Sequence, residues 1–261
     1  MMFDSFKNRY IIKGSLKALT AIHIGALEEE LKPNGIDNKF LKDNMGMPFI
    51  PGSSLKGVCR SFFEKLKRGQ DEKVCTVTNL CMDSFKGSKK EEVVKELKKN
   101  SKNIEKDLAE YIYDNICIVC KLFGSNQNSS KIMFKDSKVI EDTFTGYEIR
   151  NGVTIDRDTH IAVKGNLYEV EVVPAGTTFE FELIAENILD EELKDFMLII
   201  KLLESEMINI GGQTSRGLGS IKLENIQIQK IEPSNLIDAL LKGKQKSKTF
   251  EETFEEALKA I

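Results

Sequence analysis

The sequence predicts an α+β fold, because two amphipathic helical patterns alternate with four strand-like runs. Their order along the chain is strand, helix, strand, strand, helix, strand. This order is the ferredoxin-like (RRM-like) βαββαβ arrangement, with large insertions expected after the first helix and between the middle strands. The 261 residues are enough to bury one full core, and 41% hydrophobic with 30% charged residues is typical of a globular protein.

Four strands of the predicted core are runs rich in apolar residues. The clearest covers 178–184, where Phe179, Phe181 and Leu183 alternate with glutamates and predict a half-buried strand. The other core strands are expected at 10–19, 131–140 and 220–229, and a further alternating run covers 167–173.

Two helices complete the predicted core. The first opens at residues 51–54 and carries an apolar stripe over 55–66, and the second covers 189–207. Ser53 or Ser54 is expected to cap the first helix, because a serine hydroxyl accepts a hydrogen bond from the free N–H groups of the first turn.

The first helix also carries a candidate anion site. Lys56 and Arg60 are four residues apart, so they are expected to lie together on the flank of the apolar stripe. A helix N-terminus that presents two serine hydroxyls and two cations is a plausible binding surface for phosphate. The alternative interpretation is a capped helix face that is merely solvated.

Residues 67–128 are expected to form an insertion with one or two surface helices, stapled by a metal ion. Four of the five cysteines form two close pairs, Cys75-x5-Cys81 and Cys117-x2-Cys120, and four thiolates match a tetrahedral structural zinc site. Scattered buried cysteines are the alternative. Cys59 lies on the apolar helix stripe and is expected to be a small core residue.

A glycine-rich loop, Gly211-Gly212-Gln213-Thr214-Ser215-Arg216-Gly217-Leu218-Gly219, separates the second helix from the last strand. Four glycines let the backbone approach a phosphate closely, and the arginine adds a fork of hydrogen-bond donors. The loop therefore indicates a phosphate-binding site, with a tight turn that needs glycine as the alternative.

Composition narrows the function classes. No apolar stretch approaches the roughly 20 residues that a bilayer needs and no signal peptide is recognised, so we expect a cytoplasmic protein without membrane contact. The net charge of −3 argues against a protein that grips nucleic acid with its whole surface, but it leaves room for a local basic groove. The long polar loop at 25–43 is expected to be functional.

Several segments occur together in an order typical of one family. They are His23-Ile-Gly25, Gly35-Ile-Asp37-Asn38, Ile50-Pro-Gly-Ser-Ser-Leu-Lys-Gly57, Cys117-x2-Cys120-Lys-Leu-Phe-Gly124, Ile155-Asp-Arg-Asp-Thr159 and Gly211-Gly-x3-Arg-Gly-x-Gly219. From about residue 10 to 229 the chain resembles the RAMP superfamily. Within it, the chain resembles the repeating backbone subunit of type III (Csm/Cmr) CRISPR effector complexes.

The resemblance implies a function and site residues. Backbone subunits polymerise along a guide RNA, contact other complex subunits, and cut the complementary target RNA with a loop aspartate and a divalent metal such as Mg²⁺. That aspartate would be Asp37, and the protruding β-hairpin thumb would lie within 141–173. Guide-RNA contacts would come from the glycine loop, the first helix and the thumb: Gly211, Gly212, Thr214, Ser215, Arg216, Ser53, Ser54, Lys56, Arg60, Arg150 and Arg157. One domain would cover 1–233, and an extension would cover 234–261, with a basic stretch at 242–248 and a helical pattern at 251–260.

Alternatives remain open at this point. Asp37 lies in a cluster of turn-forming residues and is a turn residue in the alternative interpretation, while Asp43 is a weaker catalytic candidate. His23 is either a catalytic helper or a satisfied histidine at a strand end, and we favour the second. A non-cleaving subunit that scaffolds or caps the guide RNA filament is the second function, and a precursor guide RNA nuclease that uses His23 or His160 is the third.

Overall fold

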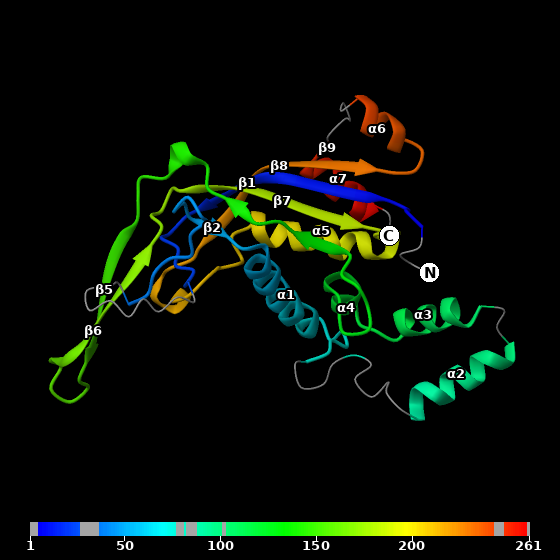
Figure 1. Ribbon diagram of the computed structural model, residues 1–261, viewed down its shortest axis with the longest axis horizontal. Helices are drawn as coiled ribbons and strands as arrows, with labels where there is room; N and C mark the ends of the chain where they lie inside the picture. The colour runs from blue at the N-terminus through cyan, green and yellow to red at the C-terminus, as the bar shows by residue number, and fades with distance from the viewer. Residues whose placement is uncertain are drawn as a thin grey trace.

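The computed structural model describes residues 5–26, 37–76, 81, 88–100, 103–242 and 248–259, and the expected α+β class is confirmed (Figure 1). The five-stranded central sheet has the order β3-β7-β1-β8-β9, and every pair of neighbouring strands is antiparallel. Its strands are β1 (Arg9–Ala18), β3 (Ile132–Phe134), β7 (Thr178–Glu186), β8 (Ile221–Ile231) and β9 (Lys248–Thr249).

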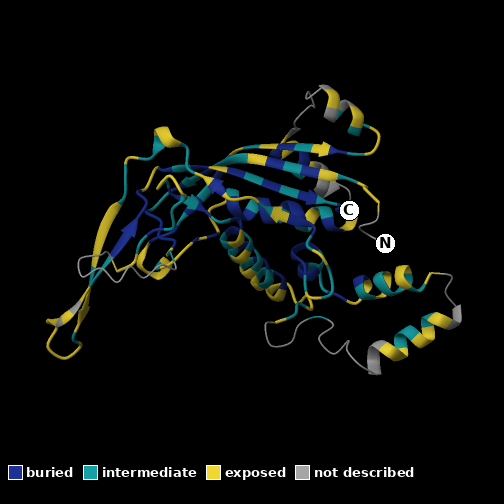
Figure 2. Ribbon diagram, in the orientation of Figure 1, coloured by how far each residue is buried: buried dark blue, intermediate teal, exposed yellow. Residues whose placement is uncertain are grey.

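The register of the sheet follows from the alternation of side chains. β1 pairs with β7 from Arg9↔Glu186 to Lys17↔Thr178, which is the strand predicted from alternating Phe and Glu. Phe179, Phe181 and Leu183 are buried, and the glutamates of the strand are more accessible. One face of the sheet therefore builds the core, and this core is the dark region between the sheet and helices in Figure 2.

Helices α1 (Gly52–Gly69) and α5 (Asp190–Glu204) pack against that face, as the apolar stripes predicted. The expected serine cap is wrong, because Pro51 occupies the cap position and neither Ser53 nor Ser54 makes a side-chain cap hydrogen bond. Instead, the Asp136 carboxylate accepts the Gly52 N–H at 2.8 Å. Gly52 lies so close to the strand that an added Cβ would be 2.2 Å from the Phe134 carbonyl oxygen, which leaves no room for a capping side chain there.

The strand expected at 131–140 is interrupted. Its first part is β3, while Ser137 and Lys138 form β4, which pairs with β2 (Phe49–Ile50) in a separate two-stranded sheet. The bond between Asp136 and Gly52 lies at this break, so the chain leaves the central sheet where it anchors the start of α1.

The insertion contains α2 (Ser88–Asn100) and α3 (Ile104–Asp114), as expected, and a short α4 (Ile118–Phe123) that the sequence did not predict. A buried polar network connects α3 to the core. The Lys131 ammonium donates to the Tyr113 hydroxyl at 2.7 Å and to the Glu192 carboxylate of α5 at 2.5 Å. Tyr113 also donates to Glu192.

A long hairpin formed by β5 (Glu148–Ile155) and β6 (Ala162–Val172) projects from the body (Figure 1). Most of its outer part is exposed (Figure 2). Beyond β8 the chain forms α6 (Leu236–Lys242), β9 and α7 (Phe250–Lys259), the last matching the expected terminal helix. Most of the basic stretch expected at 242–248 lies outside the described residues. Within the described part of the chain, none of the helices combines the length and apolar character needed to cross a bilayer.

Candidate nucleic-acid interface and metal centre

The glycine loop is anchored to the segment that follows β1. Gly212 N–H donates to the His23 carbonyl and Gly219 N–H donates to the Ala21 carbonyl, both at 2.8 Å. Gly211 and Gly219 have φ values of +83° and +88°, and a Cβ at either would be 2.1 Å from a backbone oxygen. Glycine is therefore required at both positions by conformation and by space. Between them, the exposed residues Thr214, Ser215 and Arg216 form a 3₁₀ turn that faces solvent.

Asp37 is exposed and held by the base of the hairpin. Its carboxylate accepts the Glu169 N–H at 3.0 Å, and the adjacent Asn38 pairs with β6 through backbone hydrogen bonds to Glu169 and Glu171. Residues 27–36, including Gly35 and Ile36 of the aspartate motif, lie outside the described part of the chain. The loop after Asp37 thus runs alongside β6 as an extra strand-like segment.

Arg216 contacts Tyr168, the residue of β6 that precedes Glu169. Its guanidinium contacts the Tyr168 hydroxyl and lies over the ring, with Cζ 5.9 Å from the ring centroid. Tyr168 itself covers Gly152 on β5, where an added Cβ would meet the ring at 2.1 Å. Asp37 and Arg216 therefore contact consecutive residues of β6, one through the backbone and one through a side chain.

Glu171 of β6 links the loop after Asp37 to His23 through hydrogen bonds. Its side chain is nearly buried, accepts the Phe40 N–H at 2.8 Å and binds the Lys42 ammonium at 2.8 Å. Its carbonyl oxygen lies 2.8 Å from His23 Nδ1. His23 is buried and hydrogen-bonded, as we favoured, and its own carbonyl holds the glycine loop.

The sequence did not single out Glu171 or Tyr168, since both lie in an alternating strand run that looks like an ordinary exposed edge. The only signal available was the run itself, which predicted a strand at the end of the thumb segment. Lys42, whose ammonium lies 4.0 Å from the centre of the Tyr147 ring, was also not singled out, since it is one of several charged residues in the polar loop at 25–43.

The predicted residues of α1 lie elsewhere. Ser53 is exposed and Ser54 half-buried in the first turn. Lys56 donates to the Ser130 hydroxyl at 2.8 Å, and burial lowers the pKa of its ammonium. Arg60 binds Glu64 at 2.9 Å and the Gly124 carbonyl at 3.0 Å. Both cations thus contact the segment around α4, and within the described part of the chain neither contacts Asp37 or the glycine loop.

Arg150 and Arg157 are exposed on the hairpin, Arg150 within β5 and Arg157 in the turn at its tip. The Asp156 carboxylate shapes the tip by accepting hydrogen bonds from the Thr159 and Asp158 N–H groups. These hydrogen bonds hold the pKa of Asp156 below its usual range. The hairpin also exposes a set of apolar side chains that the sequence interpretation did not emphasise: Ile149, Val153, Ile155, Ile161, Val163 and Leu167.

The four paired cysteines converge. All four sulfurs of Cys75, Cys81, Cys117 and Cys120 lie within 4.8 Å of one another, with Sγ–Sγ distances of 3.4 Å from Cys75 to Cys120 and 3.8 Å from Cys75 to Cys117. A tetrahedral zinc with Zn–S bonds of about 2.3 Å requires sulfurs about 3.8 Å apart. The donor set and its spacing therefore fit zinc.

The surroundings suit a negatively charged cluster. A hydrogen bond from Cys120 lowers the pKa of the Cys117 thiol to about 4, so the cluster holds a thiolate at neutral pH. The Cys117 N–H points at the Cys81 sulfur at 3.4 Å, and an Arg60 nitrogen lies 4.0 Å from the Cys120 sulfur. Cys59 is separate from the cluster and fully buried, as expected of a core residue.

Comparisons with known proteins identify the family of the chain. A family model described as the RAMP superfamily matches residues 15–222. A protein named CRISPR system Cms endoribonuclease Csm3 from Methanocaldococcus jannaschii is 30% identical over 239 residues, covering 86% of this chain and 82% of that one. Proteins of the same name from Methanothermobacter thermautotrophicus and Streptococcus thermophilus are 28% and 30% identical, covering 86% and 80% of this chain and 87% and 84% of their own lengths.

Proposed function

Since the chain belongs to the RAMP superfamily, we propose that it is the guide-RNA-binding backbone subunit of a type III CRISPR effector complex. In this proposal it binds guide RNA, further copies of itself and other subunits, and it cleaves complementary target RNA with Asp37 and a divalent metal. One observation carries the proposal: Asp37 and Arg216, from loops far apart in sequence, contact consecutive residues of β6.

The proposed fold assigns each segment a role. A ferredoxin-like core is supported by the strand order β3-β7-β1-β8, in which β1 and β7 each lie between antiparallel neighbours and α1 and α5 are the two crossovers. We assign residues 1–233 to one domain, with the insertion at 67–128, the thumb at 141–173 and the extension at 234–261. The projecting β5–β6 hairpin supports the thumb assignment.

Guide binding is assigned chiefly to the glycine loop. Backbone N–H groups and the exposed hydroxyls of Thr214 and Ser215 are suited to phosphate oxygens, and Arg216 supplies the charge that a phosphate needs. Ser53, Ser54 and Lys56 are proposed as additional backbone contacts, as are Arg150 and Arg157 on the thumb. Arg60 was predicted as a guide contact, but its bonds to Glu64 and Gly124 beside the cysteines favour a supporting role there.

The chemistry assigned to Asp37 is transfer of the RNA phosphodiester to its own 2′-hydroxyl. The carboxylate would take or orient the 2′-hydroxyl proton as the 2′ oxygen attacks phosphorus and the 5′ oxygen leaves, so that one P–O bond forms as another breaks. A thumb that distorts the target strand would supply the in-line geometry. The attachment of Asp37 to the Glu169 N–H favours this role by fixing the carboxylate at the thumb base.

A divalent cation such as Mg²⁺ would stabilise the charge that develops on the phosphate. Among the described residues, the four cysteines are the only group of three or more potential ligands that lie close enough to hold a metal. A cation at Asp37 would therefore depend on phosphate oxygens and water for its remaining ligands, which is the usual arrangement for Mg²⁺. The four cysteines are assigned to structural zinc, which would join the start of the insertion, at Cys75 and Cys81, to α4 near its end.

The alternatives can be separated by experiment. We expect Asp37→Ala, assembled with guide RNA and the other subunits, to keep its composition and lose target cleavage. Undiminished cleavage would leave only the scaffolding function. The precursor-processing alternative is weakened because His23 is buried and hydrogen-bonded. Clean cutting of repeat RNA by the isolated chain in EDTA would revive it.

A further inference from the structure

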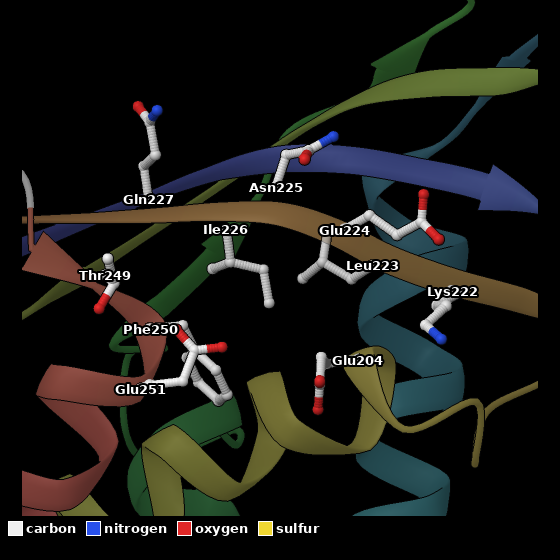
Figure 3. Close-up of a pocket in the computed structure, with 10 residues that line it drawn as sticks. All are labelled: Glu204, Lys222, Leu223, Glu224, Asn225, Ile226, Gln227, Thr249, Phe250 and Glu251. Carbon is white, nitrogen blue, oxygen red and sulfur yellow. The ribbon is translucent and has the colours of Figure 1, made fainter.

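A groove runs along the outer edge of β8, away from the projecting β5–β6 hairpin (Figure 1). It has a volume of about 450 Å³ and is lined by Glu204, residues 222–227 of β8 and residues 249–251. Figure 3 shows Leu223 and Ile226 pointing from β8 toward α5, with Phe250 and Glu251 rising from the start of α7. We call this feature the β8 edge groove.

The sheet edge in this groove is incompletely paired. On its outer side β8 pairs with β9 only through Gln227↔Thr249 and Ile228↔Lys248, so within the described chain residues 222–226 have no strand beside them. This edge contains a bulge at Asn225, which has a φ of +55° and lies where the register with β1 shifts, so an added segment would pair with the residues on either side of it. Unpaired backbone donors and acceptors on a sheet edge are a template for strand addition.

The chain itself is directed away from this edge. β9 is antiparallel to β8, so continuing past Thr249 would lead it along Ile226 and Asn225. Instead α7 begins at Phe250, whose side chain is 2% exposed and is therefore fixed in the core. The open edge is consequently a permanent feature beside the start of α7.

The charged side chains that line the groove favour a basic ligand. Lys222 is bound to Glu206 at 2.9 Å, and Glu204 is bound to Lys201 at 2.6 Å. Glu224 and Glu251 have no recorded ion pair within the described part of the chain, which leaves the groove with a negative surplus. RNA would be repelled here, whereas a lysine- or arginine-rich segment would be attracted.

We propose that the β8 edge groove binds an extended, basic segment of a partner protein, which adds to the central sheet beside β8. The backbone edge supplies the hydrogen bonds, and Glu224 and Glu251 supply the preference for cations. The family model ends at residue 222, so most of this groove is built by residues outside the matched region. The inference does not depend on the proposed RNA chemistry.

The test uses the full chain and a fluorescein-labelled nonapeptide of alternating lysine and threonine. We expect saturable binding by fluorescence anisotropy. The double variant Glu224→Lys/Glu251→Lys should bind about tenfold more weakly, because two exposed attractions become repulsions. A control variant with the same charge change at exposed positions elsewhere, Glu91→Lys/Glu141→Lys, should bind like the unmodified chain.

Two further probes isolate the strand pairing. A peptide with N-methyl groups on alternate backbone amides keeps its charge but loses donors, so it should bind several-fold more weakly than the unmethylated peptide while still binding better than a glutamate-for-lysine peptide. Equal binding of the methylated and unmethylated peptides, or of the edge and control variants, would overturn the proposal. If the edge variant is poorly folded by circular dichroism, Glu224→Gln/Glu251→Gln replaces it, with a smaller but measurable loss expected.

A different occupant would also be detected. If the edge variant changes the oligomeric state of the chain in light scattering while the peptide does not bind, the groove contacts a second copy and the proposal is wrong. Binding of a single-stranded RNA oligonucleotide should be unaffected by the edge variant; a loss of RNA binding equal to that of Arg216→Ala would also overturn it.

Discussion

The buried Lys131–Glu192–Tyr113 network allows a quantitative prediction for Glu192→Gln. The Lys131 and Glu192 side chains are 0% and 1% exposed and lie 2.5 Å apart. Glutamine keeps the shape and an acceptor for the Leu189 N–H, which Glu192 accepts at 3.0 Å, but it removes the countercharge. Lys131 must then remain charged without a partner or give up its proton.

The loss of folding stability can be estimated for either protonation state of Lys131. Losing one partner of a buried ion pair typically costs about 3–5 kcal/mol. Deprotonating a lysine at pH 7 from an unfolded pKa of 10.5 costs at most about 5 kcal/mol, at 1.36 kcal/mol per pH unit. We therefore expect Glu192→Gln to lower the free energy of unfolding by about 3–5 kcal/mol in urea titrations followed by circular dichroism.

The pH dependence has a definite sign. Burial lowers the pKa of Lys131 to about 7 in the unmodified chain, and removing the Glu192 carboxylate takes away the countercharge nearest to the ammonium, so the pKa in the variant should be no higher. Between pH 7 and 10.5 the unfolded chain then binds more protons than the folded chain, so the variant should gain stability as pH rises. The unmodified chain should show a smaller rise, because the Glu192 carboxylate 2.5 Å away favours the charged form of Lys131.

A control removes the whole network at once. The triple variant Lys131→Met/Glu192→Leu/Tyr113→Phe leaves no buried charge and frees only the half-buried Leu189 N–H, so it should be more stable than Glu192→Gln despite having more substitutions. A cost below about 1 kcal/mol for Glu192→Gln, or stability that does not rise with pH, would refute the reasoning.

Three further predictions concern the metal centre and the glycine loop. Cys120→Ala should abolish the roughly one zinc per chain expected from elemental analysis, whereas Cys59→Ala, outside the cluster, should retain it; a metal-free folded protein would exclude the zinc assignment. Arg216→Ala should weaken guide RNA binding and reduce the slope of log affinity against log salt by about one, and unchanged affinity across salt would make the loop only a turn. Gly219→Ala should lose more than about 2 kcal/mol of folding stability, because its Cβ would be 2.1 Å from a carbonyl oxygen. Gly217→Ala has open space around the added Cβ, so it should lose only about 1–2 kcal/mol, the cost of its positive φ. Equal losses in urea titrations would contradict the close-packing argument.

The sequence predicted the core because each of its elements has a periodic pattern. The stripe of α1 and the Phe–Glu alternation of β7 reflect burial on one side, which local periodicity reports directly. The cap of α1 was wrong because its partner, Asp136, is 84 residues away. Strands β2, β4 and β9 have two residues each, too few for a period, and depend on tertiary pairing.

The candidate site was partly predictable for the same reason. Gly211 and Gly219 could be identified because backbone conformation restricts the residue type, and the cysteines could be paired by spacing alone. Glu171 could not be identified from the sequence, because its burial depends on the distant residues Phe40 and Lys42, which contact its side chain beside β6. Arg60 was assigned to RNA from its place on the helix flank, but only the fold reveals the cysteines beside it.

The most direct test of the account is the single-turnover rate of target RNA cleavage by the assembled complex carrying Asp37→Asn. Asparagine keeps an oxygen for the Glu169 N–H but removes the negative charge. If Asp37 performs the chemistry, this variant should bind target RNA normally and cleave it at least about 100-fold more slowly, the same loss that we expect of Asp37→Ala. Cleavage at the unmodified rate would show that Asp37 only shapes the loop, and the active site would have to be sought elsewhere.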